Sequence, residues 1–284
     1  MRPPAVAGQF YAGTESALLK QIEKCYLHHL GPGRLPKVEK GERSIRGAVV
    51  PHAGYDFSGP IAAHVFGAIA EDGLPDTFII IGPDHHGYGS GASITTKTFT
   101  TPLGQVPVNR GIAEKMRRPP IEENPEAHAA EHSLEVQLPF LQHLKREIRF
   151  VPVCMTSQGP ETAEGMGELL ARVVKNDDVV ILASSDFSHV GANYFQPPPH
   201  GMNAGEFAKK QDELAIEPIL EIDPTGLFKA VEKNNISMCG YGCVASMLHG
   251  IKGTAKKGTL LKYATSYDVW PSSSAVGYGA IVFR

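Results

Sequence analysis

The chain has 284 residues, of which 42% are hydrophobic, and it carries 27 Lys and Arg side chains against 30 Asp and Glu, a formal net charge of −3. This composition is typical of a globular protein, and the absence of a basic excess argues against nucleic acid or anionic lipid held by charge alone. The longest apolar runs are far too short to span a membrane, and residues 1–10 contain no apolar signal core. We therefore predict a cytoplasmic protein with no nucleic-acid or membrane partner.

Strands and helices are expected to alternate along the chain. A helix is predicted over 14–29, with Thr14 as its cap and a Gly-Pro-Gly sequence at its end. Compact Val- and Ile-rich runs predict strands at 45–50, 78–81, 149–155, 179–184, 260–265 and 276–283. A hairpin is predicted over 92–108, and helices at 161–175, 204–221, 224–234 and 240–251. One more helix is expected within 131–147, bent or starting late because of Pro139.

The order of these elements predicts the fold class. Strands that alternate with helices and show no polar alternation indicate a sheet covered on both faces. The expected fold is α/β, a three-layer sandwich with a central mixed, largely parallel sheet flanked by helices. No repeat, low-complexity tract or long linker divides the sequence, so a single α/β domain is expected over residues 1–284.

Polar clusters directly follow three of the predicted strands. His52 follows the first strand, 84–86 (Asp-His-His) follows the second, and 186–189 (Asp-Phe-Ser-His) follows the strand at 179–184. Ligands of open α/β sheets bind at the carboxyl ends of the strands, because the connecting loops meet there. These three loops are therefore expected to share one rim, although the residues alone leave open whether His85 or His86 faces it.

A cysteine completes a plausible metal-binding set. Cys239 lies just before the glycine-rich start of a predicted apolar helix, where the helix dipole is expected to lower the pKa of a thiol. Two imidazoles and one anionic group, with open positions, commonly hold a reactive first-row divalent ion. A carboxylate is the more usual anion in such sites.

Structural interpretations compete with these functional ones. His52 could simply hydrogen-bond a turn, and Cys243 is better explained as a core residue than as a second ligand. Cys25 and Cys154 are interpreted as small buried hydrophobes, since four sparse cysteines form no disulfide framework. The acids of the segment 131–135 (Glu-His-Ser-Leu-Glu) are expected to complement the dipole of a helix that opens there. Within that segment, His132 could also face the rim.

Several common motifs are excluded by their context. The stretch 87–92 matches the loose G-x-G-x-x-G/A pattern, but a strand-like run follows it where dinucleotide binding requires a helix. The sequence contains no G-x-S-x-G elbow, H-E-x-x-H, P-loop or paired C-x-x-C motif. The sequence therefore argues against a serine hydrolase of the common α/β type and against a dinucleotide-binding protein.

Six ordered blocks resemble the signature blocks of the Memo family, also called AmmeMemoRadiSam system protein B in bacteria and archaea. They are 2–11, 51–55, 82–86, 131–135, 184–189 and 239–240. The family's fold is similar to that of class III extradiol dioxygenases, which use non-haem Fe(II). The resemblance implies that His52, His85 and Cys239 are the metal ligands, with His85 chosen over His86.

The resemblance also places other residues near the metal. It implies that Asp186 and His189 lie beside the ligands. Residues expected to contact the ligands or a substrate are Tyr55, His86, His132 and Cys243.

The leading functional hypothesis is a mononuclear non-haem metal site, with Fe(II) as the expected ion, that oxidises a small molecule or peptide. His189 would act as acid and base, oriented by Asp186. Copper remains open because a thiolate favours Cu(I), and zinc because Cys and His are common zinc ligands. Zinc-assisted hydrolysis is a less favoured alternative.

A hypothesis of another class is a binding module that uses the same rim to recognise a peptide or partner protein, with any metal incidental. The resemblance implies a functional link to a radical-SAM protein, which suits this alternative about as well as catalysis. Both hypotheses depend on one expectation, that the two imidazoles and the sulfur converge on a common point.

Overall fold

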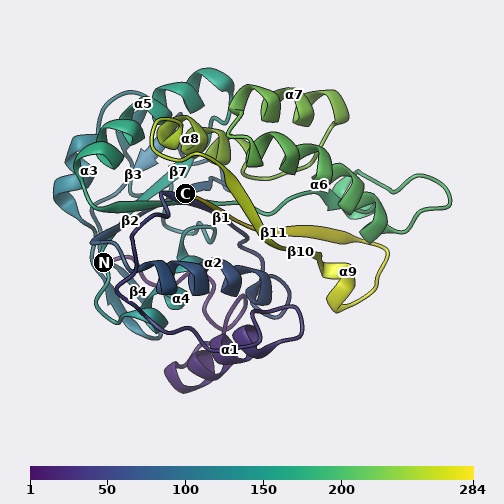
Figure 1. The fold of residues 1–284 in the computed structure, drawn as a ribbon, viewed down its shortest axis with the longest axis horizontal. Coiled ribbons are helices and arrows are strands. Elements are labelled where there is room, and N and C mark those ends of the chain that lie inside the picture. The colour runs from purple at the N-terminus through teal and green to yellow at the C-terminus, as the bar shows by residue number, and fades with distance from the viewer.

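The computed structural model describes all residues from Met1 to Arg284 and is built around a nine-stranded sheet (Figure 1). In spatial order the strands are β10 (Gly258–Thr265), β11 (Ala275–Phe283), β1 (Gly47–Val50), β8 (Val179–Ser184), β2 (Thr77–Pro83), β7 (Phe150–Met155), β3 (Ala92–Ile94) and β6 (Ile121–Glu123), with β9 (His189–Val190) paired to β11. The central strands β1, β8, β2 and β7 run parallel, whereas β11 is antiparallel to β1 and β3 is antiparallel to β7. The predicted mixed, mostly parallel sheet is confirmed.

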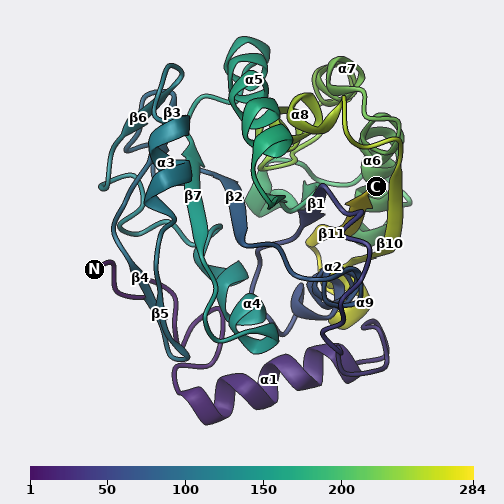
Figure 2. The ribbon, with the colours of Figure 1, turned by 60° about the vertical axis from the view of Figure 1, so that its left-hand side comes forward.

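Helices cover both faces of this sheet. One face carries α1 (Glu15–Leu27), α2 (Gly59–Asp72) and α4 (Leu138–Leu144), and the other carries α5 (Pro160–Asn176), α6 (Ala204–Leu220), α7 (Pro224–Asn234) and α8 (Tyr241–Ile251), as Figures 1 and 2 show. The short α3 (Arg110–Met116) packs against α5, and α9 (Ser266–Val269) lies beside β11. Every residue of β1, β2, β7 and β8 is buried, which explains why these strands read as unbroken apolar runs. None of the helices combines the length and apolar character needed to cross a membrane.

The predicted hairpin is present but stands apart from the main sheet. Strands β4 (Phe99–Thr101) and β5 (Gly104–Val106) pair with each other and with no strand of the main sheet, although Phe99 also forms a bridge with Arg2. Gly104 adopts a φ of +118° that favours glycine at the turn. The antiparallel pairing expected from this region comes instead from β3. The helix predicted over 14–29 is also confirmed, although it ends at Leu27 and the Thr14 side chain makes no capping hydrogen bond.

The predicted helix within 131–147 starts late. A 3₁₀ turn, η1 (Glu135–Gln137), precedes α4, and Pro139 occupies the first turn of α4, where its missing N–H needs no partner. Residues 131–134 therefore form a loop, and the expectation that Glu131 complements a helix dipole is wrong. Helix α2 was not predicted at all, because it is buried on most of its surface and shows no polar stripe.

Candidate metal centre

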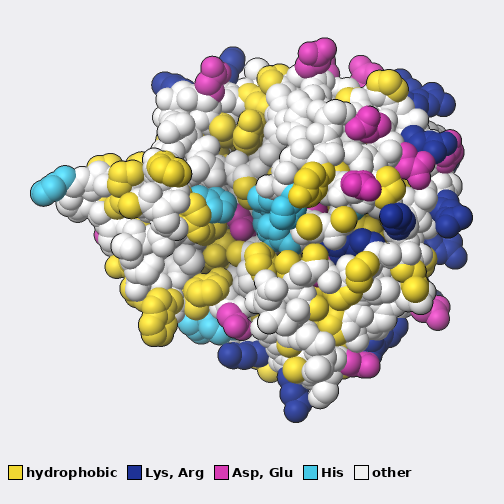
Figure 3. Space-filling model, turned by 180° about the vertical axis from the view of Figure 1, so that it is seen from behind, with side chains coloured by type: hydrophobic (Ala, Val, Ile, Leu, Met, Phe, Trp, Pro, Cys, Tyr) yellow, Lys and Arg dark blue, Asp and Glu magenta, His cyan; other side chains and the backbone are white.

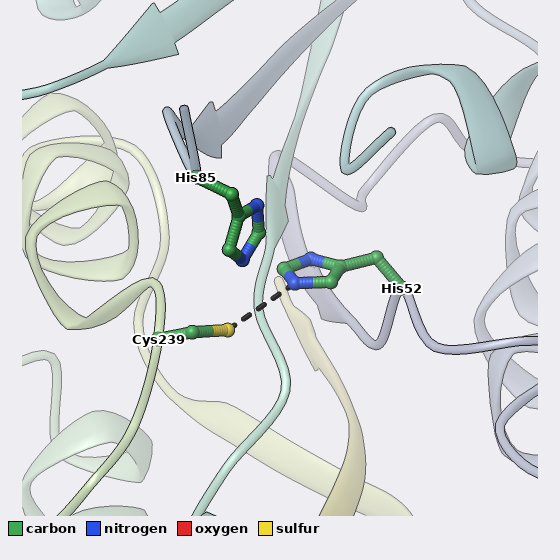
Figure 4. Close-up of side chains that lie close together, drawn as sticks. All are labelled: His52, His85 and Cys239. Atoms are coloured by element: carbon green, nitrogen blue, oxygen red, sulfur yellow. Dashed lines mark hydrogen bonds between the residues drawn. The ribbon is translucent and has the colours of Figure 1, made fainter. Parts of the chain in front are cut away.

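The carboxyl ends of β1, β8 and β2 lie side by side, and the polar loops that follow them meet at one rim. His52 follows β1 and His85 follows β2, while Cys239 approaches from the turn before α8. The ligand atoms of these three side chains all lie within 4.8 Å of one another, and the Cys239 Sγ is 3.2 Å from the His52 Nε2 (Figure 4). The predicted convergence of two imidazoles and a sulfur is confirmed.

The tautomer of His52 is fixed by Ser184 at the end of β8. The Ser184 hydroxyl donates its single proton to the Ser133 carbonyl at 2.7 Å and accepts from the Gln137 amide at 2.9 Å. The His52 Nδ1, 3.0 Å from the same hydroxyl, must therefore be the donor in that contact. This leaves the lone pair of the His52 Nε2 directed toward Cys239. Burial, followed by the neighbouring imidazoles of His132 and His85, lowers the pKa of His52, so the ring stays neutral.

His85 is oriented by Glu131. The buried Glu131 carboxylate accepts the His85 backbone N–H at 2.7 Å and the His85 Nδ1–H at 2.9 Å. Burial raises the pKa of this carboxyl, but its contacts with His85 and His132 outweigh that effect and hold the pKa well below its usual range. Because an ionised carboxylate only accepts, the proton of a neutral His85 lies on Nδ1 and its Nε2 is free to bind a metal.

The loop that carries His85 is wrapped around Asp84. One carboxylate oxygen of Asp84 accepts the backbone N–H groups of His86 and Gly87, and the other accepts the N–H of Gly89. His86 points elsewhere: it is exposed, and its Nε2 donates to the Ala130 carbonyl at 3.1 Å. The structure therefore brings His85 and not His86 to the cluster, as the resemblance implied.

Cys239 is held close to β8 by its neighbours. Gln158 donates to the Cys239 carbonyl at 2.7 Å, and the Gly240 N–H donates to the Ser185 hydroxyl at 3.0 Å. A Cβ on Gly240 would lie 2.8 Å from the Ser184 carbonyl, so glycine permits this close approach. Burial raises the pKa of the Cys239 thiol, and the expectation that the start of α8 lowers it is wrong for the metal-free chain.

This donor set fits a transition-metal ion. Metal–nitrogen and metal–sulfur bonds of about 2.0 to 2.3 Å place neighbouring tetrahedral ligands roughly 3.3 to 3.8 Å apart. The separation between the Cys239 sulfur and the His52 Nε2 is close to that range, and the limit of 4.8 Å for all three atoms requires only small rotations. Two neutral imidazoles and one thiol suit iron, copper or zinc, so the donor atoms define a candidate metal site without naming the ion.

The two residues expected beside the ligands are present, but their contacts differ from the prediction. The Asp186 carboxylate accepts the His52 backbone N–H at 2.8 Å, and burial raises the pKa of this carboxyl. The His189 Nδ1 lies 3.0 Å from the Phe187 carbonyl and 3.1 Å from the Ser237 carbonyl. Since carbonyls only accept, the proton of a neutral His189 is on Nδ1, and these carbonyls orient the ring in place of Asp186.

Of the other candidates, only His132 joins the cluster. Its ring stacks on His85 with centroids 4.5 Å apart and meets His52 edge-on at 5.4 Å, and burial lowers its pKa to about 4. Tyr55 is buried and donates to the Val136 carbonyl at 2.6 Å, which ties η1 to the core. Cys243 is fully buried on α8, and its Sγ lies 4.0 Å from the Gln158 side-chain oxygen.

Sequence reasoning missed the residues that orient the ligands. Glu131 was assigned to a helix dipole, and Ser184, Gln137 and Ser237 were not singled out. The sequence held one usable signal, since Ser184 ends a buried apolar strand where a hydroxyl needs a hydrogen-bond partner. Glu131 could not be connected to His85 without the fold, because 46 residues separate them.

A cleft of about 450 Å³ opens over the cluster. Its floor includes His52, His85, His132, Asp186 and His189, and Figure 3 shows histidine side chains near the middle of one face with hydrophobic side chains around them. Its walls are formed by Phe10, Ala53, Gly54, Phe57, Tyr194, Ser266, Trp270, Ser272, Ser274, Val276 and Tyr278. The volume lies within the range of small-molecule sites.

The fold and the cluster define a class: an α/β protein with a candidate metal centre at the carboxyl edge of its sheet. The chain matches the Memo-like protein family over residues 2–282, and it belongs to that family. It is 45% identical over 291 positions to a MEMO1 family protein of Methanopyrus kandleri, covering 100% of this chain and 99% of the relative. A MEMO1 family protein of Sulfurisphaera tokodaii is 41% identical over 293 positions, with the same coverage.

A solved structure shares the fold at low sequence identity. The crystal structure of an uncharacterized protein from Escherichia coli K12 matches with a TM-score of 0.57 and 13% identity, covering 84% of this chain and 100% of that one. This likeness concerns the fold alone.

Proposed function

We propose that this chain is a metal-dependent oxidoreductase that binds Fe(II) through His52, His85 and Cys239 and oxidises a small molecule or peptide in the adjoining cleft. The observation that carries the proposal is the fixed orientation of both rings. Each Nδ1 is bonded to a partner inside the protein, Ser184 or Glu131, so each Nε2 is left for a metal. Such partners, which leave the second ring nitrogen free and directed toward a common point, are typical of metal-binding histidines.

Open coordination would suit redox chemistry better than a structural role. Three protein ligands beside a cleft leave positions for substrate and oxygen, whereas structural sites are usually closed by four protein ligands. A redox-active ion bound there would supply electron transfer and orient the reacting molecules.

His189 is the residue of this chain best suited to move a proton. Its Nδ1 is occupied by two carbonyls, so its Nε2 is the atom that accepts a proton from a substrate group in the cleft and later returns it. Asp186 lines the same cleft, and a positive charge on His189 would favour the ionised form of its carboxyl. His52 is unsuited to this role because its Nε2 faces Cys239.

The test is metal analysis of protein purified without oxygen, followed by oxygen-consumption measurements with candidate substrates. We expect close to one equivalent of iron, lost in His52→Ala and retained in His86→Ala, a neighbouring histidine that points away from the cluster. Iron below about a tenth of an equivalent in protein loaded with Fe(II), or equal binding by the His52→Ala variant, would refute the site. Tight zinc binding with no oxygen consumption would refute the oxidoreductase and favour metal-assisted hydrolysis.

A further inference from the structure

The outer wall of the cleft consists of aromatic side chains that the metal centre does not use. Phe57, Tyr194 and Trp270 line the cleft and are 39%, 38% and 73% exposed, while Tyr278 is buried deeper in the same wall. They come from four separate segments of the chain: the loop after β1, the turn η2 (Ala192–Tyr194), the end of α9, and β11. Exposed aromatic rings gathered at the mouth of a cleft mark a binding surface.

The charges in the cleft complement those rings. None of the residues that line it is Lys or Arg, and Asp186 is the one carboxylate among them. An anionic ligand would therefore find no counter-charge in the walls, whereas a cation would be attracted.

We propose that the cleft recognises an organic cation, the ammonium group of a small molecule, held against the aromatic wall and attracted by Asp186. The faces of aromatic rings carry partial negative charge, and Trp and Tyr are favourable partners for ammonium groups. The inference rests on the proposed function in one respect, that the remaining part of the molecule reacts beside His52 and His85. The volume of about 450 Å³ accommodates such a molecule.

The chain contains its own reporter for this proposal. Trp270 is the only tryptophan, so the intrinsic tryptophan fluorescence of the protein comes from the mouth of the cleft. Three probes of nearly equal shape separate the charge from the apolar contact: choline, the uncharged 3,3-dimethylbutan-1-ol, and the anion 3,3-dimethylbutanoate. Each is titrated into the full chain, with and without one equivalent of Zn(II), while the Trp270 emission is followed.

We expect choline to shift the emission and to bind about tenfold more tightly than the alcohol, with the carboxylate weakest. Equal affinity for choline and the alcohol, a preference for the carboxylate, or no choline binding up to about 100 mM would overturn the proposal. The titration without metal separates the two proposals, because the absence of choline binding there would refute the cation site and say nothing against the metal centre. Conversely, if the protein bound no metal, the preference for choline over the alcohol would still be measurable in the titration without metal.

Variants locate the binding to the cleft. Tyr194→Leu is expected to weaken choline binding about fivefold, whereas Tyr88→Leu, which removes an exposed tyrosine outside the cleft, is expected to leave it unchanged. Asp186→Asn is expected to reduce the preference for choline over the alcohol. Equal effects of the two tyrosine variants would refute the assignment to this cleft, and calorimetry with Trp270→Phe checks the fluorescence result.

Discussion

Replacing Glu131 by Gln tests whether the fold prepares His85 for a metal. Oε1 of Glu131 accepts from the His85 Nδ1 and from the Ser133 backbone at 2.7 Å, while Oε2 accepts the His85 backbone N–H. An amide has a single oxygen, so in either orientation its NH₂ group faces a donor. With the NH₂ on the ring side, the His85 Nδ1 can accept only if its proton moves to Nε2, the atom that binds the metal. With the NH₂ on the other side, it meets the backbone N–H.

The expected loss follows from this conflict. A buried donor without an acceptor costs about 1 to 3 kcal/mol, and removal of an orienting partner commonly weakens metal binding 10- to 100-fold. We expect about 30-fold weaker metal binding at pH 8, which corresponds to about 2 kcal/mol.

The acid limb of metal binding, which is the pH range in which protons displace the metal, should shift to lower pH in Glu131→Gln. Burial lowers the pKa of His85, but the hydrogen bond and charge of Glu131 outweigh it and raise the pKa above its usual value. In the wild type, protons therefore compete with the metal for His85 as the pH falls through this raised pKa. In Glu131→Gln the pKa of His85 falls, and binding becomes less sensitive to acid although it is weaker throughout.

A competition titration against a chromophoric chelator between pH 5 and 8 measures both effects. Glu135→Gln is the matched control, because Glu135 is equally buried and accepts from Arg2, Tyr11 and two backbone N–H groups but contacts no ligand ring. It should lower the free energy of unfolding while leaving metal affinity of the folded protein and its acid limb unchanged. An affinity of Glu131→Gln within twofold of the wild type, or an acid limb that does not move, would refute the reasoning.

Two further predictions concern neighbouring polar contacts. Ser184→Ala removes the acceptor of the His52 Nδ1–H, and chelator competition should show metal binding weakened about tenfold; unchanged affinity would contradict the assigned tautomer. Asp212 is buried on α6, and burial raises its pKa from 3.8 to about 7, so its contribution to stability is complete below about pH 4 and is lost as the pH rises through 7. Urea unfolding should show a decline of about 1.4 kcal/mol per pH unit across that window, and Asp212→Asn should flatten it; an equal slope in both proteins would contradict the shifted pKa.

The positions of the ligands could be predicted from sequence because local and global patterns agree there. The strands β1, β2 and β8 are buried along their whole length and are followed by polar residues, so the rule for parallel sheets places His52, His85 and Asp186 at one edge. The choice between His85 and His86 lay beyond that rule. It depends on how the backbone N–H groups of the loop wrap around the Asp84 carboxylate, which a strand boundary does not reveal.

Other features depend on tertiary contacts that no local pattern encodes. Helix α2 begins at Gly59 and is buried on nearly every side, so it lacks the polar stripe by which helices are recognised. The pKa of Cys239 was expected to follow the dipole of α8, but desolvation by the surrounding chain is the larger effect. In both cases a short-range argument failed because burial by distant segments dominates.

Three histidines of the rim share one feature, which is a hydrogen bond that fixes the proton of the neutral ring on Nδ1. His52, His85 and His189 each place Nδ1 against a group that must accept, respectively Ser184, Glu131 and two carbonyls. The fold therefore selects the same tautomer three times and directs three Nε2 atoms outward. A metal that reaches His52 and a neutral His85 meets lone pairs already in place, so the thiol proton of Cys239 is the one that binding must then displace.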